Sequence, residues 1–176
     1  PYNPMFVEEP CLPENVDCMA RIAHKTTVPI AAGERLFGKW QYRELMEKQA
    51  VSIVQPDICH VGGIYEGRKI AAMAELYFAS VAPHNPLGPI SLASCIQLDA
   101  CIPNFLIQEH PGNPDKSDLG AGYIKEPFVI KDGYIDVPEK PGLGVELDEK
   151  AIEEKIYDGK WTTPRQYFED GSNADW

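Results

Sequence analysis

The stretch VQPDICHVGG (residues 54–63) places an aspartate at the end of a short apolar run, with a pair of glycines a few residues further on. An apolar run of this length, bounded by Pro or Gly, is typical of a strand that is covered by helices on both faces. A carboxylate at the end of such a strand raises the question of what it serves. The same arrangement of apolar run and charge recurs at four other places in the chain.

These five runs alternate with amphipathic segments. We predict strands at 5–10, 28–34, 51–57, 78–84 and 105–110, and helices at 15–25, 39–49, 66–77 and 91–102. In the second and third of these helices, apolar residues lie three and four apart with charges between them, as in an outer helix of a layered fold. Strand followed by helix, repeated in this way, predicts parallel βα units and an α/β fold.

Each predicted strand ends near one ionisable residue, and these residues are separated by 26, 23, 27 and 25 positions: Glu8, Glu34, Asp57, His84 and Glu109. In a parallel barrel the carboxyl ends of the strands converge on one face, where the active site is built. A doubly wound open sheet is the alternative, and it would spread the groups along a crevice. A single such acid is more often a helix N-cap or a solvated loop residue. Five in nearly fixed register favour a shared site on a TIM-type barrel.

The residue types suggest a chemistry. Glu8 and Glu34 supply the hard oxygen ligands that Mg²⁺ prefers. Asp57 and His84, on the next two strands, suit a general base in which the carboxylate holds the imidazole in one tautomer. Glu109, as a protonated acid, could hydrogen-bond an oxygen that gains charge as a proton leaves carbon. Together they predict proton abstraction next to a carboxylate, followed by reprotonation in a racemase or by loss of a β-hydroxyl in a dehydratase.

The composition limits the partners. A net charge of −11 over 176 residues argues against nucleic acid, which would need clustered Lys and Arg. The five cysteines contain no CxxC pair and predict neither a disulfide framework nor a zinc site. No apolar run approaches the ~20 residues that cross a bilayer. We therefore expect a cytoplasmic protein with a small-molecule partner and no membrane partner.

Four motifs resemble one enzyme family: FVEEP (6–10), AAGE (31–34), VQPDICHVGG (54–63) and VAPHNPLGPI (81–90). They are similar to the mandelate racemase branch of the enolase superfamily, and most of all to its sugar-acid dehydratases. The resemblance implies that Glu8 and Glu34 are the second and third Mg²⁺ ligands. It also implies that His84 is the base, oriented by Asp57, and that Glu109 assists at the substrate. His60 is a candidate substrate-binding residue, with a packing role as the alternative.

The resemblance also implies an architecture. Residues 1–110 would form strands 4–8, with their helices, of a partial TIM-type (β/α)7β barrel. Residues 111–176 would form a returning segment that packs on the barrel and on a capping domain absent from this chain. Within it we predict a polar loop at 110–122, a hairpin at 128–138 and a short helix at 147–161.

The activity that the resemblance implies is Mg²⁺-dependent dehydration of a sugar acid, with galactonate favoured, to the 2-keto-3-deoxy acid. The alternatives are a mannonate or gluconate dehydratase or an acid-sugar epimerase of the same superfamily, and an inactive fragment or non-catalytic homologue. The first metal ligand and the general acid would lie upstream of Pro1. We therefore expect the 176 residues alone to be inactive, and the full-length protein to be a homo-oligomer.

Overall fold

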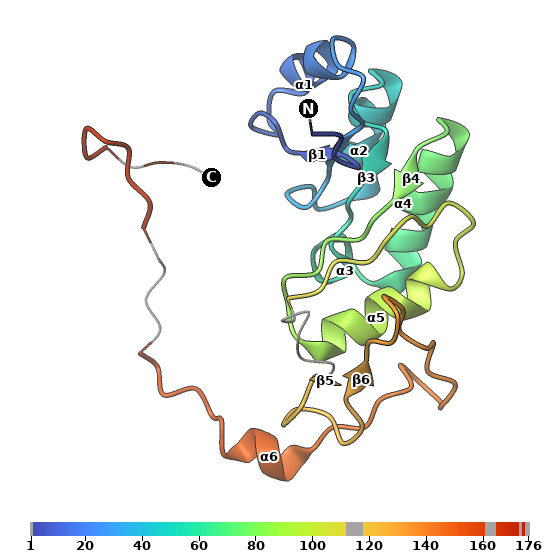
Figure 1. Cartoon of the computed structure of the whole chain (residues 1–176), viewed down its shortest axis with the longest axis vertical. Coiled ribbons are helices and arrows are strands. Elements are labelled where there is room, and N and C mark those ends of the chain that lie inside the picture. The colour runs from blue at the N-terminus through green and yellow to red at the C-terminus, as the bar shows by residue number, and fades with distance from the viewer. Residues whose placement is uncertain (1, 112–117, 161–164, 173, 175–176) are drawn as a thin grey trace.

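The computed structural model describes residues 2–111, 118–160, 165–172 and 174. Four short strands form a parallel sheet: β1 (Val7–Glu8), β2 (Ile30–Ala32), β3 (Ile53–Val54) and β4 (Ser80–Val81). They lie in the order β1-β2-β3-β4, which is also their order along the chain (Figure 1). Successive parallel strands that lie side by side are what repeated βα units produce. The prediction of an α/β fold with a parallel sheet is confirmed.

The fifth predicted strand, at 105–110, is wrong in its extent. The structure has one parallel bridge there, between Val81 and Phe105. Two backbone hydrogen bonds accompany it, from Val81 N to Asn104 O and from Leu106 N to Val81 O, both at 2.8 Å. The segment therefore runs beside β4, but among the described residues no further strand pairs with its other side. Without such a neighbour, the extended pairing that the apolar run predicted does not form.

Helices connect the strands and cover the sheet. They are α1 (Val16–Ala23), α2 (Lys39–Glu47), α4 (Ile64–Leu76) and α5 (Pro89–Asp99), each close to a predicted helix. The one-turn helix α3 (Ile58–Val61) was not predicted. It begins at Asp57, whose side chain caps it, and ends at Gly62, whose φ of 102° is in the left-handed region that favours glycine.

The main core lies between the sheet and these helices. Its largest fully buried members include Met19, Tyr42, Leu45, Ile70 and Leu98. Burying each of these apolar side chains contributes about 1.5–3 kcal/mol. Helix α4 approaches its neighbours closely at Gly67, where an added Cβ would lie 2.7 Å from Ile58 Cδ1. A separate, smaller cluster is formed by Ala31, Ile53 and Ala82, with Phe6 packed against it.

The C-terminal region packs on α5. Strands β5 (Asp118–Leu119) and β6 (Phe128–Val129) pair antiparallel, and Ile124 and Phe128 pack against residues of α5. Strand β5 falls within the predicted loop 110–122, of which residues 112–117 lie outside the described part. Within the segment 128–138, where a hairpin was predicted, the internal pairing is the bridge between Lys131 and Tyr134 around Asp132 and Gly133, while β6 pairs with β5.

Helix α6 (Glu149–Glu153) is shorter than the helix predicted at 147–161. Asp148 caps its beginning by accepting a hydrogen bond from Ala151 N at 3.1 Å. Figure 1 shows that α6 lies beyond β5 and β6, far from the parallel sheet. Within the described residues, no helix is both long and apolar enough to span a lipid bilayer. The five cysteines are free thiols.

Candidate active site

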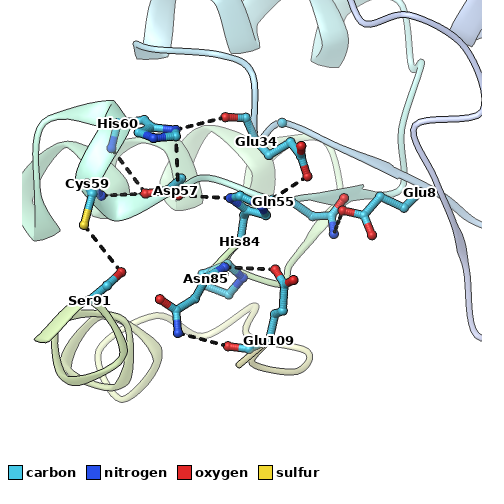
Figure 2. Close-up of polar contacts among 12 residues, drawn as sticks. Glu8, Glu34, Gln55, Asp57, Cys59, His60, His84, Asn85, Ser91 and Glu109 are labelled. Atoms are coloured by element: carbon cyan, nitrogen blue, oxygen red, sulfur yellow. Dashed lines mark hydrogen bonds and ion pairs between the residues drawn. The ribbon is translucent and has the colours of Figure 1, made fainter. Parts of the chain in front are cut away.

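The five ionisable residues singled out in the sequence follow the carboxyl ends of the parallel strands. Glu8 is the last residue of β1, and the other four follow β2, β3, β4 and the bridged segment at Phe105. Because these strands are parallel, their carboxyl ends lie on one side of the sheet. Figure 2 shows the five side chains gathered there.

The Asp57 carboxylate has two roles in the structure. Its Oδ2 lies 3.0 Å from His84 Nδ1, and its Oδ1 accepts hydrogen bonds from the backbone amides of Cys59, at 2.8 Å, and His60, at 3.3 Å (Figure 2). The side chain is fully buried, and a buried charge is tolerated only when it is hydrogen-bonded in this way. Asp57 is thus both the N-cap of α3 and the partner of His84.

The imidazole of His84 lies between two carboxylates. Nδ1 faces Asp57, while Nε2 lies 3.3 Å from Glu34 Oε2. A proton on Nδ1, donated to Asp57, leaves Nε2 with the free lone pair of the neutral ring. The side chain of His84 is 12% exposed, so the ring is held within the site by its neighbours.

Glu8 lies in an electrostatically unfavourable environment for a carboxylate. Burial raises its pKa, and the nearby carboxylates of Glu34 and Glu109 raise it further. A hydrogen bond of 3.0 Å from Gln55 Nε2 to Glu8 Oε1 acts in the opposite direction. Three carboxylates therefore lie close enough to repel one another, as they would where a cation is to be bound.

These residues fit a hard divalent cation by their chemistry. Carboxylate oxygens are the ligands that Mg²⁺ prefers, and the cation would offset the repulsion felt by Glu8. Among the described residues, no three His, Cys, Asp or Glu side chains are arranged to hold a metal ion by themselves. Glu8 and Glu34 would therefore share such an ion with water, substrate or a ligand from outside this set.

Glu109 is positioned by the residue that follows His84. Its Oε2 accepts a hydrogen bond of 2.9 Å from Asn85 N, and its backbone oxygen lies 3.4 Å from Asn85 Nδ2. Asn85 is fully buried. The segment after β4 and the segment after the bridge at Phe105 are thereby joined at the site.

His60 lies at the edge of this group. Its Nδ1 lies 3.4 Å from the backbone oxygen of Glu34 and 3.7 Å from Asp57 Oδ2. Its ring is 5.5 Å from that of Phe37, centroid to centroid. The side chain is 41% exposed, so the ring is partly open to solvent.

Two polar residues of the site were not predicted from the sequence. Gln55 and Asn85 hold Glu8 and Glu109, and neither was predicted to be in the site. Gln55 could have been found, because it lies two positions before Asp57 and side chains two apart on a strand share a face. Glu9, the residue after Glu8, accepts a hydrogen bond at its Oε2 from Arg35 Nε at 3.2 Å, which ties the ends of β1 and β2 together.

Comparison with known proteins identifies the family of the chain. The chain belongs to the family described as enolase C-terminal domain-like, whose family model matches residues 1–151. A crystal structure of an enolase from Agrobacterium radiobacter, with bound sodium and L-malate, superposes with a TM-score of 0.85 at 38% identity. The superposition covers 98% of this chain and 47% of the Agrobacterium chain. A mandelate racemase/muconate lactonizing enzyme from Sulfitobacter is 40% identical, with a TM-score of 0.83, over 92% of this chain and 40% of that one.

Curated proteins that are similar to the chain include D-galactonate dehydratases. The chain is 44% identical to D-galactonate dehydratase from Ralstonia pickettii and 42% identical to D-galactonate dehydratase from Pectobacterium atrosepticum, in each case over 181 residues. Both alignments include 100% of this chain but 47% of the relative. The chain therefore spans about half the length of the curated relatives it matches.

Proposed function

We propose that the chain forms the carboxyl-terminal half of a Mg²⁺-dependent sugar-acid dehydratase that converts D-galactonate to the 2-keto-3-deoxy acid. The observation that carries the proposal is the placement of His84, with Nδ1 at 3.0 Å from Asp57 and Nε2 facing the carboxylate side of the site. Such a pair is a general base set beside a cation site. The similarity to D-galactonate dehydratases supports the choice of substrate.

In this proposal His84 Nε2 removes the proton from C2 of the substrate. Asp57 accepts a hydrogen bond from Nδ1–H and stabilises the imidazolium that forms. Glu109, in its protonated form, donates a hydrogen bond to the carboxylate oxygen on which charge accumulates. Mg²⁺, held by Glu8 and Glu34 when bound, supplies positive charge next to the substrate carboxylate.

Loss of the 3-hydroxyl as water gives an enol, which becomes the 2-keto-3-deoxy acid by taking up a proton at C3 and losing the proton of its enol hydroxyl. We assign the acid that protonates this leaving group, together with the first metal ligand, to a part of the polypeptide outside residues 1–176. His60, which is open to solvent at the rim, is proposed to contact a hydroxyl of the sugar acid.

The fold that accompanies this function is a (β/α)7β barrel, of which residues 1–110 supply strands 4–8. Four parallel strands and one bridged segment in chain order support it, as do relatives about twice as long as this chain. Residues 111–176 then pack on the barrel and on a capping domain encoded elsewhere. The complete protein is proposed to form a homo-oligomer.

The test is turnover of a panel of hexonates by a full-length polypeptide that contains residues 1–176, in the presence of Mg²⁺. D-galactonate should yield a keto acid, detected as its semicarbazone. Preferential conversion of mannonate or gluconate would instead support the related dehydratases, and inversion at C2 without loss of water would support an epimerase. No reaction with any hexonate would contradict the proposal and leave a non-catalytic homologue.

A further inference from the structure

We propose that Gln55 is the positioning residue for Glu8, and that its amide holds this carboxylate in the orientation in which it binds the cation. The inference rests on the proposed function, because it takes Glu8 as a metal ligand. It adds Gln55, which does not itself bind the metal. Its hydrogen bond sets the orientation in which the Glu8 carboxylate faces the metal.

The contact joins two strands that are not neighbours. Glu8 ends β1 and Gln55 follows β3, while β2 lies between them. Gln55 Nε2 nevertheless reaches Glu8 Oε1 at 3.0 Å. The register that pairs Ala32 with Val54 places Gly33 beside Gln55, where a Cβ would meet the Gln55 backbone. The long Gln55 side chain crosses β2 to reach the carboxylate at the end of β1.

The folding stability of the protein does not explain why an amide side chain stands at position 55. Gln55 is 4% exposed, and its Oε1 is buried without a hydrogen-bond partner among the described residues. A buried acceptor left without a partner is unfavourable for folding. An apolar residue of similar length would avoid this cost, but it could not donate the hydrogen bond to Glu8.

The orientation of the amide matches an ionised ligand. A carboxylate that has lost its proton only accepts hydrogen bonds, so the NH₂ group must face it. Because Gln55 Nε2 lies 3.0 Å from Glu8 Oε1, this hydrogen bond restricts the Glu8 carboxylate to one orientation.

Groups that orient metal ligands have a known scale of effect. Removing one typically weakens metal binding or activity by 10–100-fold. We expect Gln55→Met, which keeps the length of the side chain and removes the amide, to weaken Mn²⁺ binding about 10–100-fold. The melting temperature of the metal-free protein should change little, because the variant removes the unpaired buried acceptor of Gln55 but also removes the hydrogen bond to Glu8.

The experiment is a Mn²⁺ titration and an EPR spectrum of bound Mn²⁺, made on a full-length polypeptide that contains residues 1–176. Gln97→Met is the matched control, because the Gln97 amide also makes one hydrogen bond, of 3.3 Å to Pro138 O, and lies on α5. Gln55→Met should bind Mn²⁺ more weakly and alter the EPR line shape, which reports how the ligands are arranged. Gln97→Met should change neither.

A second variant guards against failure of Gln55→Met to fold. Gln55→Asn keeps the amide but shortens its reach by one methylene group, and its Mn²⁺ affinity should fall below that of the wild type. Wild-type affinity and an unchanged spectrum in a folded Gln55 variant would overturn the inference. Absence of Mn²⁺ binding by the wild-type protein would instead overturn the proposed function.

Discussion

The Asp57 side chain contacts three groups, and each contact limits which residue types can occupy position 57. Two backbone amides of α3 and the imidazole of His84 all approach its two oxygens. The interpretation of Asp57 as a helix cap and its interpretation as the partner of a base were alternatives in the sequence. The structure satisfies both, because the two oxygens of one carboxylate serve different neighbours.

At the residue scale, the first prediction concerns His84. His84→Asn should lower exchange of the C2 proton of D-galactonate with solvent by about 10²–10⁴-fold, the usual contribution of a general base. Mn²⁺ binding should persist, because Glu8 and Glu34 remain. Exchange is measured by NMR in D₂O, with His24→Asn, at the exposed C-cap of α1, as the control that keeps the site unchanged. Undiminished exchange in His84→Asn would remove this residue from the role of base.

A second prediction at this scale concerns Asp99, the last residue of α5. Its Oδ1 is buried without a partner among the described residues, and burial raises the pKa of the carboxyl to about 8. The folded state therefore keeps a proton that the unfolded chain loses near pH 4. Stability from this group is complete below about pH 4 and is lost as pH rises to about 8.

Asp99→Asn should remove this loss. The gain in stability over the wild type should grow between pH 5 and 8, by up to about 1.4 kcal/mol per pH unit, in urea unfolding curves. Asp17→Asn is the control, because Lys48 lowers the pKa of this exposed carboxyl and its contribution is constant over that range. A difference between Asp99→Asn and wild type that did not change with pH would contradict the assignment.

At the scale of elements, the end of β2 packs closely against α2 and against the end of β3. The hydroxyl of Tyr42, on α2, donates a hydrogen bond of 2.6 Å to Gly33 O. A Cβ at Gly33 would lie 2.9 Å from Tyr42 Cε1 and 3.0 Å from the backbone nitrogen of Gln55. The strand end that precedes Glu34 can come this close to β3 only because position 33 has no side chain.

Gly33→Ala should therefore lower the free energy of unfolding by about 1–3 kcal/mol through overpacking, beyond the cost of its backbone conformation. It should also weaken Mn²⁺ binding, because Glu34 is the next residue. Gly63→Ala is the matched control, since Gly63 also has a positive φ, 91°, but a Cβ there would meet nothing within 4 Å. Equal losses of stability in the two variants, measured by urea unfolding, would show that close packing at Gly33 does not matter.

At the scale of the whole molecule, the sheet is open at both sides. Among the described residues, β1 pairs only with β2, and the segment at Phe105 pairs only with β4. Apolar side chains remain exposed along these two edges, with Val7 at 39%, Phe105 at 40% and Ile107 at 45%. Unpaired strand edges with exposed apolar residues are sites of association with another chain.

Residues 1–176 expressed alone should therefore self-associate as concentration rises, and should bind Mn²⁺ much more weakly than the full-length polypeptide. The physical reasons are the two open edges and a set of only two carboxylate ligands. Light scattering after gel filtration and a Mn²⁺ titration make the comparison. A monodisperse monomer that binds Mn²⁺ as tightly as the full-length protein would contradict the proposed partial barrel.

Much of the element order could be predicted from the sequence. Parallel βα units follow from local patterns, namely short apolar runs, amphipathic segments and the residues that bound them. The same pattern implied that Glu34, Asp57 and His84 share one side of the sheet, because parallel strands bring their carboxyl ends together. Helix α3 escaped prediction because one turn is too short to show a periodic pattern, although Asp57 and Gly62 mark its two ends.

The sequence by itself determined the order of strands and helices and the end of the sheet at which the charges gather, because both depend on patterns within about 25 residues of chain. Only the tertiary structure decided which polar groups meet. Gln55 reaches Glu8 across 47 positions and Arg35 reaches Glu9 across 26. Amide and guanidinium side chains have no periodic signature, so contacts of this kind depend on how closely neighbouring strands approach. At the end of β2 that approach is possible because Gly33 has no side chain.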